Sequence, residues 1–425
     1  MARREAVARA SGAMSQADAA LSFLSSCHAD LTRLRRHLHA HPELGFEEHR
    51  TAELVAQQLH AVGADEVHRG IGGTGVVAVI RGRRSAPAAL PAGAEPGPQA
   101  VALRADMDAL PMHEELEAPW RSTRSGVMHA CGHDGHTAML LGAARYLAAT
   151  RDFHGRVHCI FQPAEEGLGG ARAMLDAGLF ERFPSDWVFG MHNWPQLPAG
   201  RIGLAPGVMM AAADRITIEI TGTGGHGAHP HLAVDPVLVA GHVITAVQSL
   251  VAREINPQQQ AVLSLCAMQA GDLGAMSVIP RRVSLVGTAR SFRADVQQRL
   301  EERLAPLVQS VALAFGAHAE LRYERVYPAT VNTPAVAFHA AEVATELVGD
   351  AAVVRDLPPS MGAEDFAFML QAVPGAYLRL GTGSEGGAQL HTTRFDFNDA
   401  VLPLGAALYA RLAERALSQP AAAML

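Results

Sequence analysis

The 425-residue sequence contains no lysine, since all 35 of its basic residues are arginine. A lysine amine is needed for a Schiff base with a carbonyl substrate or pyridoxal phosphate. It is also needed at the end of a P-loop and on the nucleotide-binding strand of a kinase. The sequence therefore excludes these enzymes and Ser-Lys hydrolases. The 21 histidines point elsewhere, because histidine is the commonest metal ligand and acid–base group near neutral pH.

Charge, cysteine and long apolar runs are also scarce. The formal net charge is −7 and only 18% of residues are charged, so we expect no nucleic-acid partner. No uninterrupted apolar run reaches the 18 residues of a membrane helix, and we expect no membrane partner. Four irregularly spaced cysteines do not make a disulfide framework. Residues 1–20 lack the apolar centre of a signal peptide, which predicts a frayed leader and a cytoplasmic protein.

The spacing of apolar residues predicts two kinds of domain. Continuous apolar strands at 75–80, 101–104, 157–162 and 187–191, with a helix at 137–150, indicate an α/β sheet covered on both faces. From about Ala212 the strands alternate instead, and the order β-α-β-β-α-β is that of a ferredoxin-like domain. We therefore expect an α/β domain formed by 1–211 and 327–425, with an inserted α+β domain at 212–326.

Three local patterns are predicted to be structural. Residues 33–60 are helical in pattern but interrupted at His41–Pro42, because proline disfavours a helical conformation in the residue before it. Residues 85–99 are rich in Pro, Ala and Gly and predict a surface loop. Gly70–Gly75 matches GxGxxG, but a strand follows where a dinucleotide site needs a helix, so we interpret it as a turn.

Several segments carry side chains suited to metal chemistry. Residues 128–136 (MHACGHDGH) place a thiol and three imidazoles in a glycine-rich turn, which alone leaves metal binding and a structural role equally open. Glu165 and Glu166 follow an apolar strand and project in different directions, so one can bind metal while the other moves a proton. His192 and His391 also follow predicted strands. The carboxyl ends of strands are where open α/β sheets place their sites.

Seven sequence blocks in a fixed order resemble the M20 family of metallopeptidases and amidohydrolases. The resemblance is closest to its hippurate hydrolases, N-acyl-amino-acid amidohydrolases and plant indole-acetyl-amino-acid hydrolases. It extends from about Arg35 to Asn398. The blocks are LRADMDALP (103–111), MHACGHDGHT (128–137), FQPAEEG (161–167), GMHNWP (190–195), GGHGAHPH (224–231), SMGAEDF (360–366) and LHTTRFDFND (390–399).

The resemblance implies a zinc-peptidase-like catalytic domain, and it makes the inserted ferredoxin-like domain a lid that carries dimer contacts. It implies two divalent metal ions per subunit, Zn, Mn, Co or Ni, with Cys131 as the shared ligand. Glu165 is the implied general acid/base, and His226, from the lid of the partner subunit, is implied to hold the carbonyl oxygen. The implied metal ligands are Cys131, His133, Glu166, His192 and His391.

The resemblance also implies supporting and substrate-binding residues. Asp106 and Asp108 are expected to support the ligands by hydrogen bonds, with Asp108 orienting a histidine. Arg290 could clasp the substrate carboxylate, although a surface ion pair is an equally good interpretation. Glu364 is expected to line the site. Two departures from the family pattern, Ser277 and His229, leave substrate recognition open.

The implied reaction is metal-dependent hydrolysis of the amide bond of N-acyl amino acids, with hippurate-like, N-acetyl or aromatic acyl groups. The alternatives are an M20 dipeptidase, an N-acyl-diaminopimelate deacylase and a non-catalytic ligand-binding relative. The last is disfavoured because all five expected ligands and the base are present. His37, His39 and His41 resemble ligands by number, but their spacing does not share one helix face, and we interpret them as structural.

Overall fold

The computed structural model describes residues 15–85 and 97–418. Its chain divides into two compact units. The first comprises residues up to 207, 332–357 and 369 onward, and the second comprises 208–331 and 358–368. Residues 1–14 of the expected leader and most of the expected loop at 85–99 lie outside the described residues. Residues 16–20 of that leader are not frayed, because they begin the helix α1 (Gln16–Ser26), in which Ala17 and Ala20 are buried.

A mixed eight-stranded sheet forms the centre of the first unit, in the order β1-β2-β4-β3-β5-β16-β6-β15. Its middle strands β4, β3, β5 and β16 run parallel, so their carboxyl ends share one edge. Every residue of β3 is buried, as expected for a sheet covered on both faces. The strands are β1 (Glu66–Ile71), β2 (Gly75–Arg81), β3 (Ala100–Asp106), β4 (Arg156–Gln162), β5 (Trp187–Pro198), β6 (Ile202–Gly203), β15 (Val353–Val354) and β16 (Gly375–Gly383).

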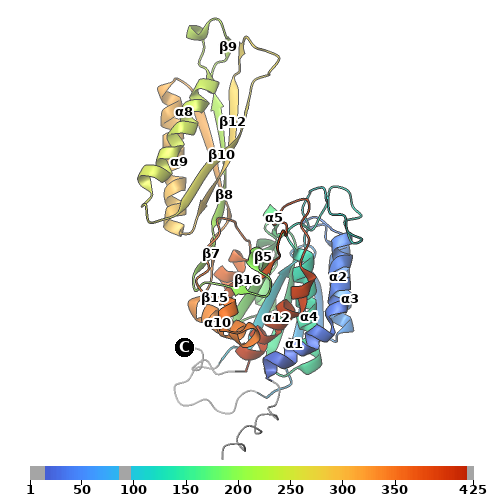
Figure 1. Ribbon diagram of the computed structural model, residues 1–425. Helices are drawn as coiled ribbons and strands as arrows, with labels where there is room; N and C mark the ends of the chain where they lie inside the picture. Colours follow the sequence, from blue (N-terminus) through green and yellow to red (C-terminus); the bar gives the residue numbers. More distant parts are fainter. Residues whose placement is uncertain (1–14, 86–96, 419–425) are drawn as a thin grey trace, which may run out of the picture. The chain divides into compact units, whose positions relative to one another are not determined.

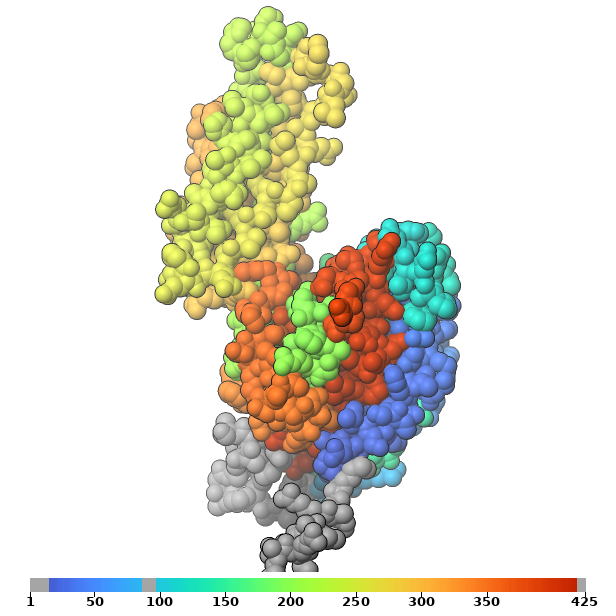
Figure 2. Space-filling view, in the orientation of Figure 1, coloured from blue at the N-terminus to red at the C-terminus, as the bar shows by residue number. Residues whose placement is uncertain are grey.

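Helices from both ends of the chain pack together on this sheet. Helix α12 contacts α1, α2 and α4, and Figures 1 and 2 show the blue N-terminal helices beside red C-terminal segments. Segments almost 400 residues apart in sequence therefore lie side by side. The helices of this unit are α1 (Gln16–Ser26), α2 (His28–Ala40), α3 (His49–Ala61), α4 (His133–Thr150), α5 (Glu165–Leu168), α6 (Gly170–Asp176), α7 (Leu179–Arg182), α10 (Pro334–Val348), α11 (Ala367–Ala372, which begins at the boundary with the second unit) and α12 (Leu402–Ala416).

Two local predictions can be compared directly with the structure. The helix expected at 33–60 is interrupted as predicted, but the break is longer and extends from His41 to Glu48. The Glu43 carboxylate fixes the start of α3, because it accepts hydrogen bonds from the Arg50 and Thr51 amides. The Gly70–Gly75 segment joins β1 and β2 in an antiparallel hairpin, so a strand rather than a helix follows it.

The second unit is built on an antiparallel sheet in the order β10-β12-β8-β13. Ile216, Ile218 and Ile220 alternate with more exposed residues along β8 and face the helices α8 and α9. With the chain order β8-α8-β10-β12-α9-β13, this is a ferredoxin-like arrangement. Its elements are β7 (Val208–Met210), β8 (Ala212–Thr221), β9 (Gly225–His226), α8 (Pro236–Ser249), β10 (Ala261–Ala270), β11 (Val278–Ile279), β12 (Arg282–Ser291), α9 (Ala294–Ala314), β13 (His318–Tyr327) and β14 (Thr330–Val331).

Residues 358–368 pack with the second unit, whereas the sequence analysis assigned them to the α/β domain. The Ala211 amide lies 3.0 Å from the carbonyl oxygens of both Ser360 and Gly362, which ties this segment to the start of β8. Such a pairing depends on tertiary contacts that no local sequence pattern encodes.

One helical stretch of the described residues, Pro236–Glu254, is long and apolar enough by average composition to cross a membrane. His242, Gln248 and Arg253 interrupt its apolar run in the sequence. Val239, Ala240, Val243 and Val247 are buried against the four-stranded sheet, as in the core helix of a globular unit. Length and composition alone do not distinguish a membrane-spanning helix from the core helix of a globular unit.

We predict that Leu285→Ala destabilises the second unit. Leu285 is fully buried on β12, so truncation leaves a cavity and costs about 2–5 kcal/mol. Met268, its cross-strand neighbour on β10, is 54% exposed, and Met268→Ala is the matched control with a cost below about 1 kcal/mol. Urea denaturation followed by circular dichroism measures both. Equal losses in the two variants would contradict this account of the core.

Candidate metal centre

The five expected ligands meet at the carboxyl-end edge of the first unit's sheet. Cys131 and His133 lie at the start of α4, Glu166 follows β4, His192 lies on β5, and His391 follows β16. These segments are separated by up to 260 residues in sequence. The parallel strands bring them together because their carboxyl ends lie next to one another.

Their donor atoms form two overlapping groups that share the Cys131 sulfur. One group is Cys131, His133 and His192, and the other is Cys131, Glu166 and His391, with all donor atoms of a group within 4.8 Å of one another. The Cys131 Sγ lies 3.3 Å from Nε2 of both His192 and His391. The Nε2 of His391 lies 3.2 Å from Oε1 of Glu166.

Unusual backbone conformations hold these side chains in place. Gly132, between two of the expected ligands, has φ +94°, and a Cβ there would lie 2.4 Å from Oδ1 of Asn193. Ala164 and His391 have φ +53° and +59°, values that cost a non-glycine residue of the order of 1 kcal/mol or more. The Ala164 amide donates to Glu48 Oε1 at 2.8 Å, and the His391 amide donates to the Ala130 carbonyl at 2.8 Å.

Hydrogen bonds orient the ligands from behind. The Nδ1 of His133 lies 3.1 Å from Oδ1 of Asp108, which turns Nε2 toward the cluster. The other oxygen of Asp108 accepts from the Glu166 amide at 2.9 Å. The Nδ1 of His192 donates to the Asn193 carbonyl at 2.7 Å, which leaves its Nε2 facing Cys131.

His136 is the third imidazole of the glycine-rich turn, and the structure gives it a different place from His133. Its Nδ1 lies 2.6 Å from Asp106 and its Nε2 lies 2.6 Å from Oδ1 of Asn193, so both ring nitrogens are engaged. Asp106 also accepts from Arg104 at 2.7 Å. The sequence analysis missed this supporting chain, although the i, i+3 spacing of His133 and His136 on one helix was a usable signal.

The donor set fits divalent cations. The buried Nε2 of His133 has no hydrogen-bond partner within the described residues, as expected for a nitrogen that coordinates an ion. Burial, reinforced by Glu166, Glu165 and Asp106, raises the pKa of the Cys131 thiol well above its ordinary value. Burial opposes charge on His133, but Asp106, Asp108 and Glu166 outweigh it and raise its pKa to about 10. A bound cation would displace both protons and balance the buried negative charge.

A second buried layer of charge lies behind α4. His39 on α2 places Nδ1 2.8 Å from Asp134 and Nε2 3.2 Å from Glu114. Arg35, one turn earlier, has no exposed surface and pairs with Asp396 and Asp399. The structural interpretation of His39 agrees with these contacts, but the sequence did not reveal which acids surround it.

The expected substrate-binding residues lie in the second unit, in three places. His226, on β9, pairs with Val278 in the exposed β9–β11 ribbon at one end of the unit, together with His229 and Ser277 (Figure 1). Arg290 is half-buried on β12, where it donates to the Thr288 hydroxyl and the Ala289 carbonyl. Glu364 is buried, and its carboxylate accepts from the Phe366 amide at 2.9 Å.

The chain belongs to the M20 family, which confirms the resemblance inferred from its motifs. The profile of peptidase family M20/M25/M40 matches residues 102–415. Hippurate hydrolase of Campylobacter jejuni is 41% identical over 384 residues, 90% of this chain and 96% of that protein. N-acetylcysteine deacetylase of Bacillus subtilis is 37% identical over 387 residues, which are 91% of this chain and 96% of that protein.

A solved structure confirms the α/β fold class. The YxeP protein of Bacillus subtilis, a dinuclear metal-binding peptidase of the M20 family, superposes with a TM-score of 0.77 at 34% identity, covering 92% of this chain and 99% of that one. Family membership makes the protein a metal-dependent amidohydrolase.

We predict that part of the protein's stability is lost as the pH rises through about 9. Burial opposes the charge of His39, but its bonds to Asp134 and Glu114 raise its pKa to about 9, above the 6.5 of an unfolded histidine. A raised folded-state pKa contributes stability that is complete below pH 6.5 and disappears as the folded group deprotonates. Urea denaturation at a series of pH values should show this loss.

The test variant is His39→Gln, which should be less stable at pH 7 and should not lose further stability as the pH rises through about 9. The matched control is His37→Gln. His37 lies on the same helix but is not bonded to these acids, so His37→Gln should retain the wild-type pH dependence. An unchanged pH profile in His39→Gln would contradict the assignment.

Proposed function

We propose that this amidohydrolase cleaves the amide bond of N-acyl amino acids that carry a small or aromatic acyl group, using two divalent cations per subunit. The proposal rests mainly on one observation, the convergence of five donor side chains into two groups that share the Cys131 sulfur. Cys131, His133 and His192 would hold one ion, and Cys131, Glu166 and His391 the other. The hippurate hydrolase and N-acetylcysteine deacetylase relatives support this substrate class.

When bound, divalent cations act as Lewis acids on the amide carbonyl and acidify water toward a pKa of about 7. Glu165 is adjacent to the ligand Glu166 in sequence and forms a donor group with it and His133. We assign Glu165 the proton transfers: it takes a proton from the attacking water and returns it to the leaving nitrogen. The products are a carboxylic acid and a free amino acid.

The second unit would supply the remaining contacts. We propose that His226 donates to the carbonyl oxygen as it gains charge, and that it comes from the lid of the partner subunit in a homodimer. Since the chain has no lysine, the cation that binds the substrate carboxylate must be an arginine or a protonated histidine. Arg290 is our candidate for it, and Ser277, His229 and Glu364 would shape the acyl or amino-acid site.

Thiolate and imidazole donors favour zinc, but mixed sites with a carboxylate also accept manganese, cobalt or nickel. We propose a cytoplasmic location, because all four cysteines are free and three of them are buried, as expected in a reducing compartment.

We predict that the protein releases free amino acid from hippurate, N-acetyl-methionine or indole-acetyl-amino acids when supplied with Mn²⁺, Co²⁺ or Zn²⁺. Glu165→Gln should retain metal and fold but lose about 10²–10⁴-fold in kcat, because it cannot accept the water proton. Amino-acid release quantified by chromatography measures both. Activity only on dipeptides or on N-acyl-diaminopimelate would contradict the proposed substrate class and favour one of those two instead. Near-normal turnover by Glu165→Gln would remove Glu165 from the mechanism.

We predict that Cys131→Ala lowers the occupancy of both ions, since its sulfur belongs to both donor groups. Cys159→Ala is the matched control, because Cys159 is also buried, on β4, but lies in none of the donor groups found among the described residues. Elemental analysis of the purified proteins gives metal per subunit. Full occupancy in Cys131→Ala would refute the shared-ligand role.

A further inference from the structure

We propose that Arg35 is a positioning residue for the metal centre: its buried guanidinium fixes the segment that follows His391 against the start of helix α4, and so sets the geometry of the ion bound by Cys131, Glu166 and His391. This inference rests on the proposed two-ion site. It concerns a residue far from that site in sequence, in a helix that supplies no ligand.

The contacts of Arg35 join two segments that each carry an expected ligand. Its Nη1 lies 2.8 Å from Oδ1 of Asp396 and 3.8 Å from Oδ2 of Asp134, and its Nε donates to Oδ1 of Asp399 at 2.6 Å. Asp134 is adjacent to His133, and Asp396 and Asp399 lie five and eight residues after His391. One planar guanidinium therefore links α4 to the chain beyond His391.

Burial makes this link strong and specific. The Arg35 and Asp134 side chains have no exposed surface, and the Asp396 side chain is 29% exposed. Three carboxylates gathered in a buried place repel one another, and the Arg35 cation between them offsets that repulsion. Arginine suits the position because its fork of donors can serve several carboxylates in fixed directions, which an ammonium group cannot do.

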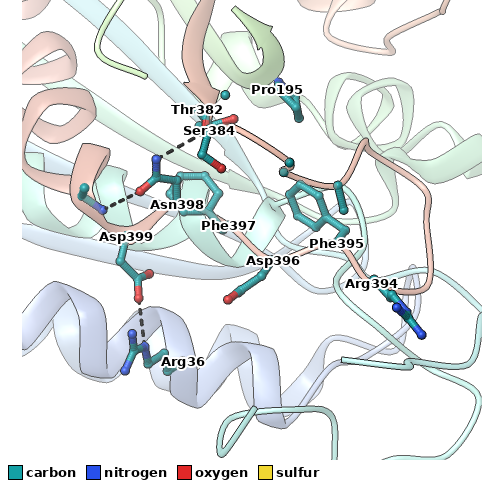
Figure 3. A pocket seen from close by; sticks show the side chains of 15 residues that line it. Arg36, Pro195, Thr382, Ser384, Arg394, Phe395, Asp396, Phe397, Asn398 and Asp399 are labelled. Carbon is teal, nitrogen blue, oxygen red and sulfur yellow. Dashed lines mark hydrogen bonds and ion pairs between the residues drawn. The ribbon is translucent and has the colours of Figure 1, made fainter. Parts of the chain in front are cut away.

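The segment after His391 also borders a cavity and makes contacts besides those of Arg35. A cavity of about 630 Å³ is lined by residues 394–400, by the glycine-rich residues 382–384 and 386–388, and by Arg36 of α2 (Figure 3). Asn398 bonds to the Thr382 carbonyl and Asp399 pairs with Arg36, as the figure shows. Phe395 and Phe397 of this segment are buried in the core of the first unit, and the ion pairs with Arg35 fix the acidic residues between and beyond them.

His391 is sensitive to such a restraint. Its left-handed backbone, at φ +59°, is held by a hydrogen bond to Ala130, so a shift of the following residues would relax it toward an ordinary conformation. Such a shift would move Nε2 away from Cys131 and Glu166 without touching His133 or His192. The expected effect is therefore selective for one of the two ions.

The test is zinc binding, measured by elemental analysis on protein equilibrated at chelator-buffered free Zn²⁺ concentrations. Wild type should bind two ions. Arg35→Lys, which keeps the charge but not the fork, should bind one ion as wild type does and the second at least about tenfold more weakly, as is typical when a group supporting a ligand is lost. Asp396→Ala, which removes the link from the other side, should do the same and provides a second route if Arg35→Lys does not fold.

Arg36→Gln is the matched control. Arg36 is the neighbouring arginine and pairs with the same Asp399, but it has no ion pair with Asp134 or Asp396 within the described residues. It should bind both ions as wild type does, even if its melting temperature falls. Unchanged affinity for both ions in Arg35→Lys and Asp396→Ala, or an equal loss in Arg36→Gln, would overturn the proposal. Fewer than two ions on wild type would instead refute the two-ion site itself.

Discussion

The sulfur of Cys131 is the point on which the site depends, because donors from distant parts of the chain approach it within a few ångströms. Imidazoles from β5 and from the loop after β16 lie 3.3 Å from it, and the carboxylates of Glu165 and Glu166 add negative charge around it. Buried charges of one sign repel strongly at low dielectric, so such a cluster requires either protons or cations. The sheet supplies the proximity, and the positive-φ backbone at Gly132, Ala164 and His391 supplies the directions.

The N-terminal helices act as the outer support of this cluster, although they contribute no donor to it. Glu48 holds the Ala164 amide ahead of Glu165, His39 holds Asp134 beside His133, and Arg35 holds the segment after His391. Each support joins a residue within 50 positions of the N-terminus to a segment that carries expected ligands. Helices α1 and α2 themselves pack against α12, beside the red C-terminal segments in Figure 2.

The sequence predicted the fold class and the family, and it named the five side chains that the structure brings together. Those predictions succeed because continuous apolar strands, strand ends and ordered motifs are local patterns. It did not predict that residues 358–368 join the second unit, that α4 begins at His133, or that His136 and Asn193 bond to each other. These features depend on which distant residues meet after folding. An isolated Arg35 or Asp396 looks like any charged surface residue in the sequence.

The absence of lysine has no explanation in the structure, but it has a consequence there. Arg35, Arg104 and Arg379 are the largest side chains with almost no exposed surface, and each engages several groups or an aromatic ring. A buried lysine readily loses its proton, whereas a guanidinium stays charged and distributes its donors among several acceptors. Supports built on arginine therefore keep their charge across the pH range in which a carboxylate base such as Glu165 works. His39 differs from these arginines, because it loses its charge as the pH rises through about 9.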